Sequence, residues 1–181
     1  TPQTIFSTAS VAKTLTALAV MQLVEAGKIE LDAPVTTYLP YFEMADDRYK
    51  EITVGQILGH RAGIPDFDWL APGYYDNPNN SDGALEDVVY SLKTAELLSE
   101  PGESFSYSTM GFAILGDVIA KVSGQSYEDY ISEHIFDTLD MTSTHQRFTE
   151  LDLDRMASPH VPGPNGGWIV NPVFPYAREE G

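Results

Sequence analysis

The 181-residue chain contains no cysteine, so disulfide bonds, thiolate metal sites and cysteine nucleophiles are all excluded. Basic residues are scarce: 10 Lys and Arg stand against 27 Asp and Glu, which gives a net charge of −17. A surface that binds nucleic acid needs clustered Lys or Arg, and the sequence shows no such cluster. The acidic residues are dispersed, as on a solvated surface, and we expect no nucleic-acid partner.

Long apolar runs are also missing. The longest apolar stretch, residues 17–24, is too short and too interrupted to cross a bilayer, so we expect no membrane segment. The histidines lie at positions 60, 134, 145 and 160 without the spacing of a metal site, and we expect neither a metal nor another cofactor. With 43% hydrophobic residues, the chain has enough apolar material for a core, and its length fits one unit over residues 1–181.

Apolar periodicity predicts a mainly helical chain. The first helix is expected from Ser10 to Gly27, with glycine at the end, where a left-handed residue is favoured. Residues 64–83 are rich in Pro, Gly, Asn and Asp and predict a long loop. Further helices are expected over residues 53–58, 85–92, 94–98, 109–122 and 127–136.

The most informative pattern is Ser10-Val-Ala-Lys13, which opens an almost wholly apolar helix. The spacing places a hydroxyl and an amine one helical turn apart on the same face. A serine hydroxyl becomes a good nucleophile only when a nearby base takes its proton. A lysine amine is such a base when an apolar environment lowers its pKa, and residues 14–24 would supply that environment. Taken alone, however, the pattern is better explained by a helix-capping serine followed by an ordinary lysine.

Three segments, in order along the chain, carry a family resemblance. Residues 6–35, which include the Ser-Val-Ala-Lys pattern, resemble the nucleophile helix of the serine β-lactamase and penicillin-binding-protein superfamily. Residues 52–66, with the sequence His-Arg-Ala-Gly, resemble that family's Leu-Thr-His-x-x-Gly segment. Residues 101–116 resemble the loop that carries its Tyr-x-Asn motif. The chain is most similar to the class C-like branch of β-lactamases, D-peptidases and esterases.

The resemblance implies an α+β fold in which a helical region packs against an antiparallel sheet, with the active site between them. It implies acyl transfer, in which Ser10 attacks a carbonyl, Lys13 and Tyr107 move the proton, and water hydrolyses the acyl-enzyme. The substrate would be a small molecule or peptide: an ester, a D-amino-acid peptide or a β-lactam. In this family the histidine that matches His60 is structural, although a serine and a histidine often pair in catalysis.

Two departures from the family pattern bear on the substrate. The second motif reads Tyr107-Ser-Thr109, so threonine stands where the family usually has asparagine. Asparagine offers an acceptor oxygen and two N–H donors, whereas threonine offers one hydroxyl, so we expect Thr109 to bind substrate only in part. This favours an esterase or peptidase over a true class C β-lactamase. The family's third motif, Lys-Thr-Gly or His-x-Gly on a late strand, is absent from the sequence.

The chain is therefore expected to be the helical part of a β-lactamase-like domain, truncated at both ends, with most of the antiparallel sheet outside it. Loss of the late strand would remove one oxyanion N–H donor, at a cost of about 3 to 4 kcal/mol. We expect the chain alone to be inactive or weakly active and its full-length parent to be a serine hydrolase. An apolar face left open by the missing sheet would lead to self-association. The remaining alternative is a non-catalytic binding or sensor module, which the joint presence of Ser10, Lys13 and Tyr107 disfavours.

Overall fold

The computed structural model describes residues 1, 3–66, 79 and 81–170. The α-helices are α1 (Lys13–Glu25), α2 (Val54–Leu58), α3 (Ala84–Ser91), α4 (Thr109–Ser123) and α5 (Tyr127–Ile131). A π-helical segment, Ser132–Phe136, continues α5. Short 3-10 helices lie at Ala9–Ala12, Val35–Thr37, Asp47–Glu51, Leu92–Thr94, Phe148–Glu150 and Leu153–Arg155. The two strands are β1 (His160–Pro162) and β2 (Trp168–Val170).

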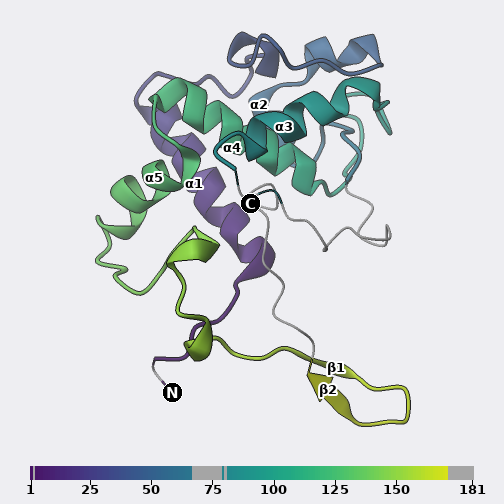
Figure 1. Ribbon diagram of the computed structural model, residues 1–181. Coiled ribbons are helices and arrows are strands. Elements are labelled where there is room, and N and C mark those ends of the chain that lie inside the picture. Colours follow the sequence, from purple (N-terminus) through teal and green to yellow (C-terminus); the bar gives the residue numbers. More distant parts are fainter. Residues whose placement is uncertain (2, 67–78, 80, 171–181) are drawn as a thin grey trace.

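Helix α4 is the centre of the helical part. It packs against α1, α2, α3 and α5 (Figure 1). Its apolar side chains are buried on almost every side. The Ser108 hydroxyl caps its start by accepting the N–H of Gly111 at 3.0 Å. Gly124 ends it in the left-handed conformation, with a φ of 77°. The helix therefore begins and ends at positions where its sequence carries a start and a stop signal.

Helix α1 buries one face in the core and exposes some apolar side chains on the other. One face joins the core through fully buried residues, among them Ala19, Val20 and Leu23. On the other face Val11, which precedes the helix by two residues, Leu18 and Met21 are 65%, 43% and 45% exposed. We call these three residues the α1 stripe, because their spacing places them along one side of the helix. The stripe is the kind of open apolar face that the sequence led us to expect.

The two strands form an antiparallel hairpin that lies apart from the helices (Figure 1). In the register, Val161 lies opposite Ile169. The described residues thus form a largely helical structure with one small sheet, which agrees with the expected α+β class. None of the helices in the described ranges is both long and apolar enough to cross a lipid bilayer.

Most of the expected helices are confirmed, and one is wrong. Helix α2 begins with a capping box, in which the side chains and backbone N–H groups of Thr53 and Gln56 bond reciprocally. No helix covers residues 94–98: after a short 3-10 turn the Ala95 carbonyl accepts the N–H of Ala45, and the Leu98 N–H donates to Gly63. These tertiary bonds draw the segment into an irregular conformation. The expected loop at 64–83 lies mostly outside the described residues.

Candidate active site

The structure brings Ser10, Lys13 and Tyr107 together. The Tyr107 hydroxyl donates a hydrogen bond to Ser10 Oγ at 2.8 Å, across 97 residues of sequence. Lys13 Nζ donates to the same oxygen at 3.4 Å. Ser10 Oγ is therefore contacted by two groups that can carry a proton, from two separate elements of the fold. The three side chains that the resemblance singled out thus lie together, and their catalytic roles stay a prediction.

The start of the first helix presents Ser10 to solvent. Ser10 lies in a 3-10 turn just before α1, where the first N–H groups have no partner within the helix. Ala9, directly before it, has a φ of 44°, an uncommon conformation for a residue other than glycine. Strained backbone of this kind is found preferentially at functional sites. The exposed hydroxyl thus lies at the positive end of a helix, where a developing oxyanion is stabilised.

Lys13 is almost fully buried, with 7% of its surface exposed. Its Nζ lies 5.4 Å from the centre of the Tyr107 ring and 5.8 Å from that of Phe112. Among the described residues, no carboxylate lies within ion-pair distance of this amine. The amine therefore faces the Tyr107 and Phe112 rings and the serine hydroxyl; these aromatic contacts come from other parts of the chain than residues 14–24, from which we expected the apolar environment.

The contacts with Ser10 and Lys13 also change the pKa of Tyr107. Partial burial acts to raise the pKa of Tyr107, but hydrogen bonds with the Ser10 and Lys13 side chains, the positive charge of Lys13 and a hydrogen bond with Thr109 outweigh it. The pKa of Tyr107 therefore lies below its ordinary value of 10.0. A phenol shifted in this direction is ionised in a larger fraction of molecules at neutral pH, and its phenolate form can accept the serine proton.

One residue, His60, contacts the Tyr107 segment on both sides. Its carbonyl accepts the N–H of Ser106 at 2.8 Å, and its Nδ1 accepts the N–H of Ser108 at 3.2 Å. The His60 ring lies against the Tyr107 ring, with centroids 4.5 Å apart and planes 31° apart. Its centroid also lies 4.9 Å from that of the Phe112 ring. Burial and the positive charge of Lys13 lower the pKa of His60 below 6.5, and Asp66 opposes them.

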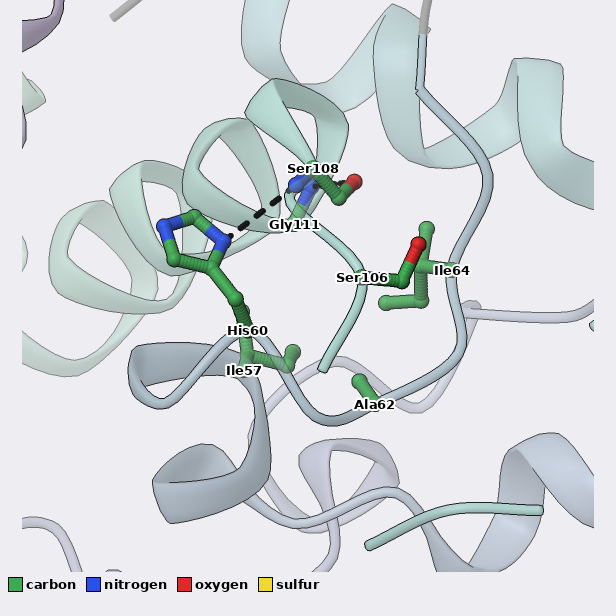
Figure 2. A pocket seen from close by; sticks show the side chains of 7 residues that line it. All are labelled: Ile57, His60, Ala62, Ile64, Ser106, Ser108 and Gly111. Carbon is green, nitrogen blue, oxygen red and sulfur yellow. Dashed lines mark hydrogen bonds between the residues drawn. The ribbon is translucent and has the colours of Figure 1, made fainter. Parts of the chain in front are cut away.

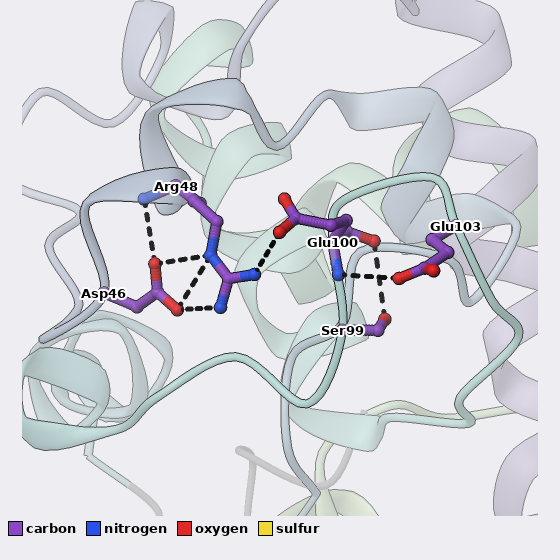
Figure 3. Close-up of polar contacts among 5 residues, drawn as sticks. All are labelled: Asp46, Arg48, Ser99, Glu100 and Glu103. Atoms are coloured by element: carbon purple, nitrogen blue, oxygen red, sulfur yellow. Dashed lines mark hydrogen bonds and ion pairs between the residues drawn. The ribbon is translucent and has the colours of Figure 1, made fainter.

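Two arginines fix the turn that precedes Tyr107. Arg48 pairs with Asp46 and reaches across to Glu100, which its Nη1 meets at 2.6 Å (Figure 3). The Arg61 guanidinium donates to the Gly102 carbonyl, and the Gly102 N–H donates to the Arg61 carbonyl at 2.7 Å. The segments around residues 61 and 102 are thus joined in both directions.

Thr109 is nearly fully buried at the start of α4. Its N–H donates to Asp66 Oδ1 at 2.8 Å, and its side chain contributes a hydrogen bond to Tyr107. The site thus contains Asp66 and Phe112, which we did not predict from the sequence. The position of Asp66, directly after a Gly-Ile-Pro turn, is the only local signal that could have suggested it.

A small cavity lies beside His60, on a different set of residues from the serine. Its volume is about 10 Å³, roughly the space that one water molecule needs, and it is too small for a substrate. Figure 2 shows the residues that line it, with the bond from Ser108 to the His60 ring: Ile57, His60, Ala62, Ile64, Ser106, Ser108 and Gly111. In the described part of the chain, no three His, Asp or Glu side chains gather closely enough to hold a metal ion.

Comparison with known proteins shows what the chain resembles. Protein flp of Staphylococcus aureus (strain MW2) is 36% identical over 144 residues, which are 79% of this chain and 28% of that protein. The octameric penicillin-binding protein homologue of Pyrococcus abyssi superimposes with a TM-score of 0.79 and 32% identity, covering 98% of this chain and 41% of that one. For a D-stereospecific amidohydrolase of a Streptomyces species, the TM-score is 0.77 at 25% identity, covering 94% of this chain and 54% of that one.

The chain spans from 28% to 54% of the length of these proteins. A family model described as Beta-lactamase matches residues 1–179. The match covers almost the whole sequence, and it includes both the Ser-x-x-Lys turn and the tyrosine loop whose side chains meet at Ser10. The chain belongs to the β-lactamase family, within the superfamily of serine β-lactamases and penicillin-binding proteins.

Proposed function

We propose that the protein is a serine hydrolase that works through an acyl-enzyme formed on Ser10. One observation carries the proposal: Lys13 Nζ and the Tyr107 hydroxyl both contact Ser10 Oγ, at 3.4 and 2.8 Å. A nucleophile within hydrogen-bond reach of its proton acceptor is the arrangement that covalent catalysis requires. Membership of the β-lactamase family supports the same assignment.

The proposed reaction begins when Ser10 Oγ attacks the substrate carbonyl and its proton passes to the phenolate form of Tyr107, which the positive charge of Lys13 stabilises. The tetrahedral intermediate collapses as the bond to the leaving group breaks, and the leaving group takes up that proton. Water then adds to the Ser10 ester, the acid product departs, and Ser10 regains its proton. The helix N-terminus at Ser10 supplies positive potential where the oxyanion develops.

For the substrate we propose an ester or a D-amino-acid amide or peptide, in preference to a β-lactam. Thr109 replaces the family's asparagine, and its hydroxyl is nearly fully buried and engaged with Tyr107. No side-chain amide is therefore offered at this position to the acyl group of a substrate. The D-stereospecific amidohydrolase from Streptomyces, which has a similar fold, supports this choice. A true class C β-lactamase is the alternative.

Self-association is a second, separate proposal. The exposed Val11, Leu18 and Met21 side chains of the α1 stripe provide an apolar surface. The Pyrococcus relative, which is octameric, lends support.

The test is intact-protein mass after incubation with a fluorophosphonate and, separately, with a penicillin. We expect the full-length protein to gain one fluorophosphonate adduct, and the Ser10→Ala variant to gain none. A penicillin adduct should form slowly in the natural protein and faster after Thr109→Asn. Absence of any Ser10-dependent adduct would favour the non-catalytic alternative, and rapid penicillin turnover by the natural protein would favour the class C β-lactamase.

A further inference from the structure

We infer that His60 is a positioning residue, which fixes the catalytic Tyr107 in contact with Ser10. The inference rests on the proposed function, in which Tyr107 moves the proton of Ser10. No hydrogen bond among the described residues joins the His60 side chain to Ser10. His60 acts instead through residues 106–108, the segment that carries the tyrosine. Two hydrogen bonds join His60 to the residues on either side of Tyr107, and one ring contact joins it to Tyr107 itself.

The backbone bonds bracket the tyrosine. The Ser106 N–H donates to the His60 carbonyl at 2.8 Å and the Ser108 N–H donates to His60 Nδ1 at 3.2 Å. The donors are the residues directly before and after Tyr107. Because both ends of this three-residue segment are bonded to one partner, the Cα–Cβ direction of Tyr107 cannot change without breaking a bond to His60.

The ring contact restrains the remaining freedom of the tyrosine side chain. The His60 ring contacts Tyr107, with centroids 4.5 Å apart, and Phe112 of α4, with centroids 4.9 Å apart; the planes are tilted by 31° and 34°. The imidazole therefore links the phenol ring to the helix by packing against both. Its removal would open space beside the Tyr107 ring, whose side chain is 41% exposed and whose other contacts include the hydrogen bonds at its hydroxyl and the nearby Lys13 amine.

The backbone conformation of His60 points the same way. His60 has a φ of 52°, at a helix end where glycine is usual. Its N–H donates to Ile57 at 2.9 Å and the next N–H donates to Gln56 at 2.7 Å, which together make a Schellman motif. A residue other than glycine is uncommon in this conformation. The contacts of the imidazole here are with residues 105, 107 and 108 and with Phe112 of α4.

The bond from Ser108 requires Nδ1 without a proton, so the arrangement is sensitive to pH. The charged groups that act on the ring are Lys13 of α1 and Asp66 of the following loop, whereas Phe112 of α4 is uncharged. Burial, Lys13 and the weaker opposing effect of Asp66 keep the pKa of His60 below 6.5. At neutral pH Nδ1 of His60 is therefore unprotonated and accepts the Ser108 N–H. In acid Nδ1 takes up a proton and can no longer accept this bond.

The first experiment is a double-mutant cycle on the rate of fluorophosphonate labelling in the full-length protein. His60→Gly suits the left-handed backbone but removes the ring and the acceptor, and we expect it to slow labelling about tenfold to a hundredfold. In a Tyr107→Phe background the same substitution should slow labelling less than about threefold. Equal factors in both backgrounds would overturn the inference, because they would show that His60 acts independently of Tyr107.

His60→Asn is the matched variant. Asparagine accepts the left-handed conformation and its side-chain oxygen can accept the Ser108 N–H, so it should recover part of the lost rate. In the natural protein the acid limb of the rate profile should steepen below pH 6.5, where His60 takes up a proton. The asparagine variant, which does not titrate, should lack this steepening, and an identical steepening would contradict the inference.

A readout without turnover separates this inference from the proposed function. Nitrogen-15 spectra of histidine-labelled protein, assigned with the His60→Asn variant, should show Nδ1 of His60 unprotonated and Nε2 protonated at pH 7. Protonation at Nδ1 instead would overturn the inference even in an active enzyme. A wild-type protein that never labels at Ser10 would overturn the proposed function, while the tautomer would still report whether the contact exists.

Discussion

Helices α1 and α2 end in the same backbone motif, but different residues occupy its left-handed position. Gly27 follows α1 with a φ of 68°, and His60 follows α2 with a φ of 52°. In each motif two N–H groups bond back to the helix, at 2.9 and 2.9 Å after α1 and at 2.9 and 2.7 Å after α2. The first end carries the residue that the conformation favours, and the second does not.

The left-handed residue after α1 has only a structural role, whereas the one after α2 also contacts the candidate active site. A left-handed residue with a side chain costs about 1 kcal/mol relative to glycine. Gly27 avoids this cost, and a side chain there would meet no atom within 4 Å. His60 accepts the cost and contacts both neighbours of Tyr107. The end of α2 thus carries a residue that its backbone disfavours, and in our inference the side chain of this residue positions Tyr107.

The largest effect on the labelling rate is expected at Tyr107, the residue that His60 contacts at the end of α2. Tyr107→Phe removes the hydroxyl that contacts Ser10 but keeps the ring that lies on His60. We expect labelling to slow by about a hundredfold to ten-thousandfold, the usual range for loss of an acid–base group, with unfolding nearly unchanged. Labelling kinetics and urea unfolding of the same samples measure both quantities. A labelling rate within a few-fold of the natural protein would remove Tyr107 from the mechanism.

The next prediction compares substitutions at the two helix ends, Gly27 after α1 and His60 after α2. Gly27→Ala should lower the free energy of unfolding by about 1 kcal/mol, because alanine is strained at a φ of 68°, and should leave labelling unchanged. His60→Gly should show the reverse: slower labelling, with the loss of ring packing partly offset by a relaxed backbone. Lys28→Ala, at the exposed neighbouring position, is the control for surface substitution. Slower labelling in Gly27→Ala would break the distinction.

A smaller effect concerns a helix start, where Asp46 caps the 3-10 helix Asp47–Glu51. Hydrogen bonds from the Arg48 side chain and backbone lower the pKa of Asp46 from 3.8 to about 2. The stabilisation from this pair is fully present above pH 3.8 and is lost as the pH falls through 2. Asp46→Asn should therefore be less stable than the natural protein at pH 6, and the gap should close in strong acid. A gap that stays constant in unfolding curves across this range would contradict the pairing.

The smallest effect on stability is expected on the open face of α1. Leu18→Gln replaces an exposed member of the α1 stripe and should change the free energy of unfolding by less than about 0.5 kcal/mol. It should nevertheless reduce self-association of the 181-residue chain in a sedimentation concentration series. Glu30→Gln, at an exposed position five residues after the end of α1, should not. A natural chain that stays monomeric at every concentration would rule out the stripe as an association surface.

The parts of the fold that follow from local signals were predictable. Thr53 with Gln56 marks the start of α2, and Gly124 marks the end of α4, because caps act within a few residues. The expected helix at 94–98 failed because bonds to distant residues, such as Leu98 to Gly63, decide that segment. Such pairings leave no trace in local periodicity.

In the candidate site, too, local contacts could be predicted from the sequence and long-range contacts could not. Ser10 and Lys13 share one turn of helix, so their contact follows from spacing. Tyr107 is 97 residues from Ser10, and only the family resemblance connected the two before the structure did. The position of His60 beside Tyr107 depends on a left-handed backbone that sequence patterns assign to glycine, so its contacts required the fold.

The most direct test of the account is the site of covalent labelling. The full-length protein is treated with a fluorophosphonate, digested, and the modified peptide is sequenced by tandem mass spectrometry, with Ser10→Ala treated in parallel. The account predicts one adduct, located on Ser10, and no adduct in the variant. An adduct on another residue, or none on the natural protein, would contradict the claim that Ser10, Lys13 and Tyr107 form an acyl-transfer site.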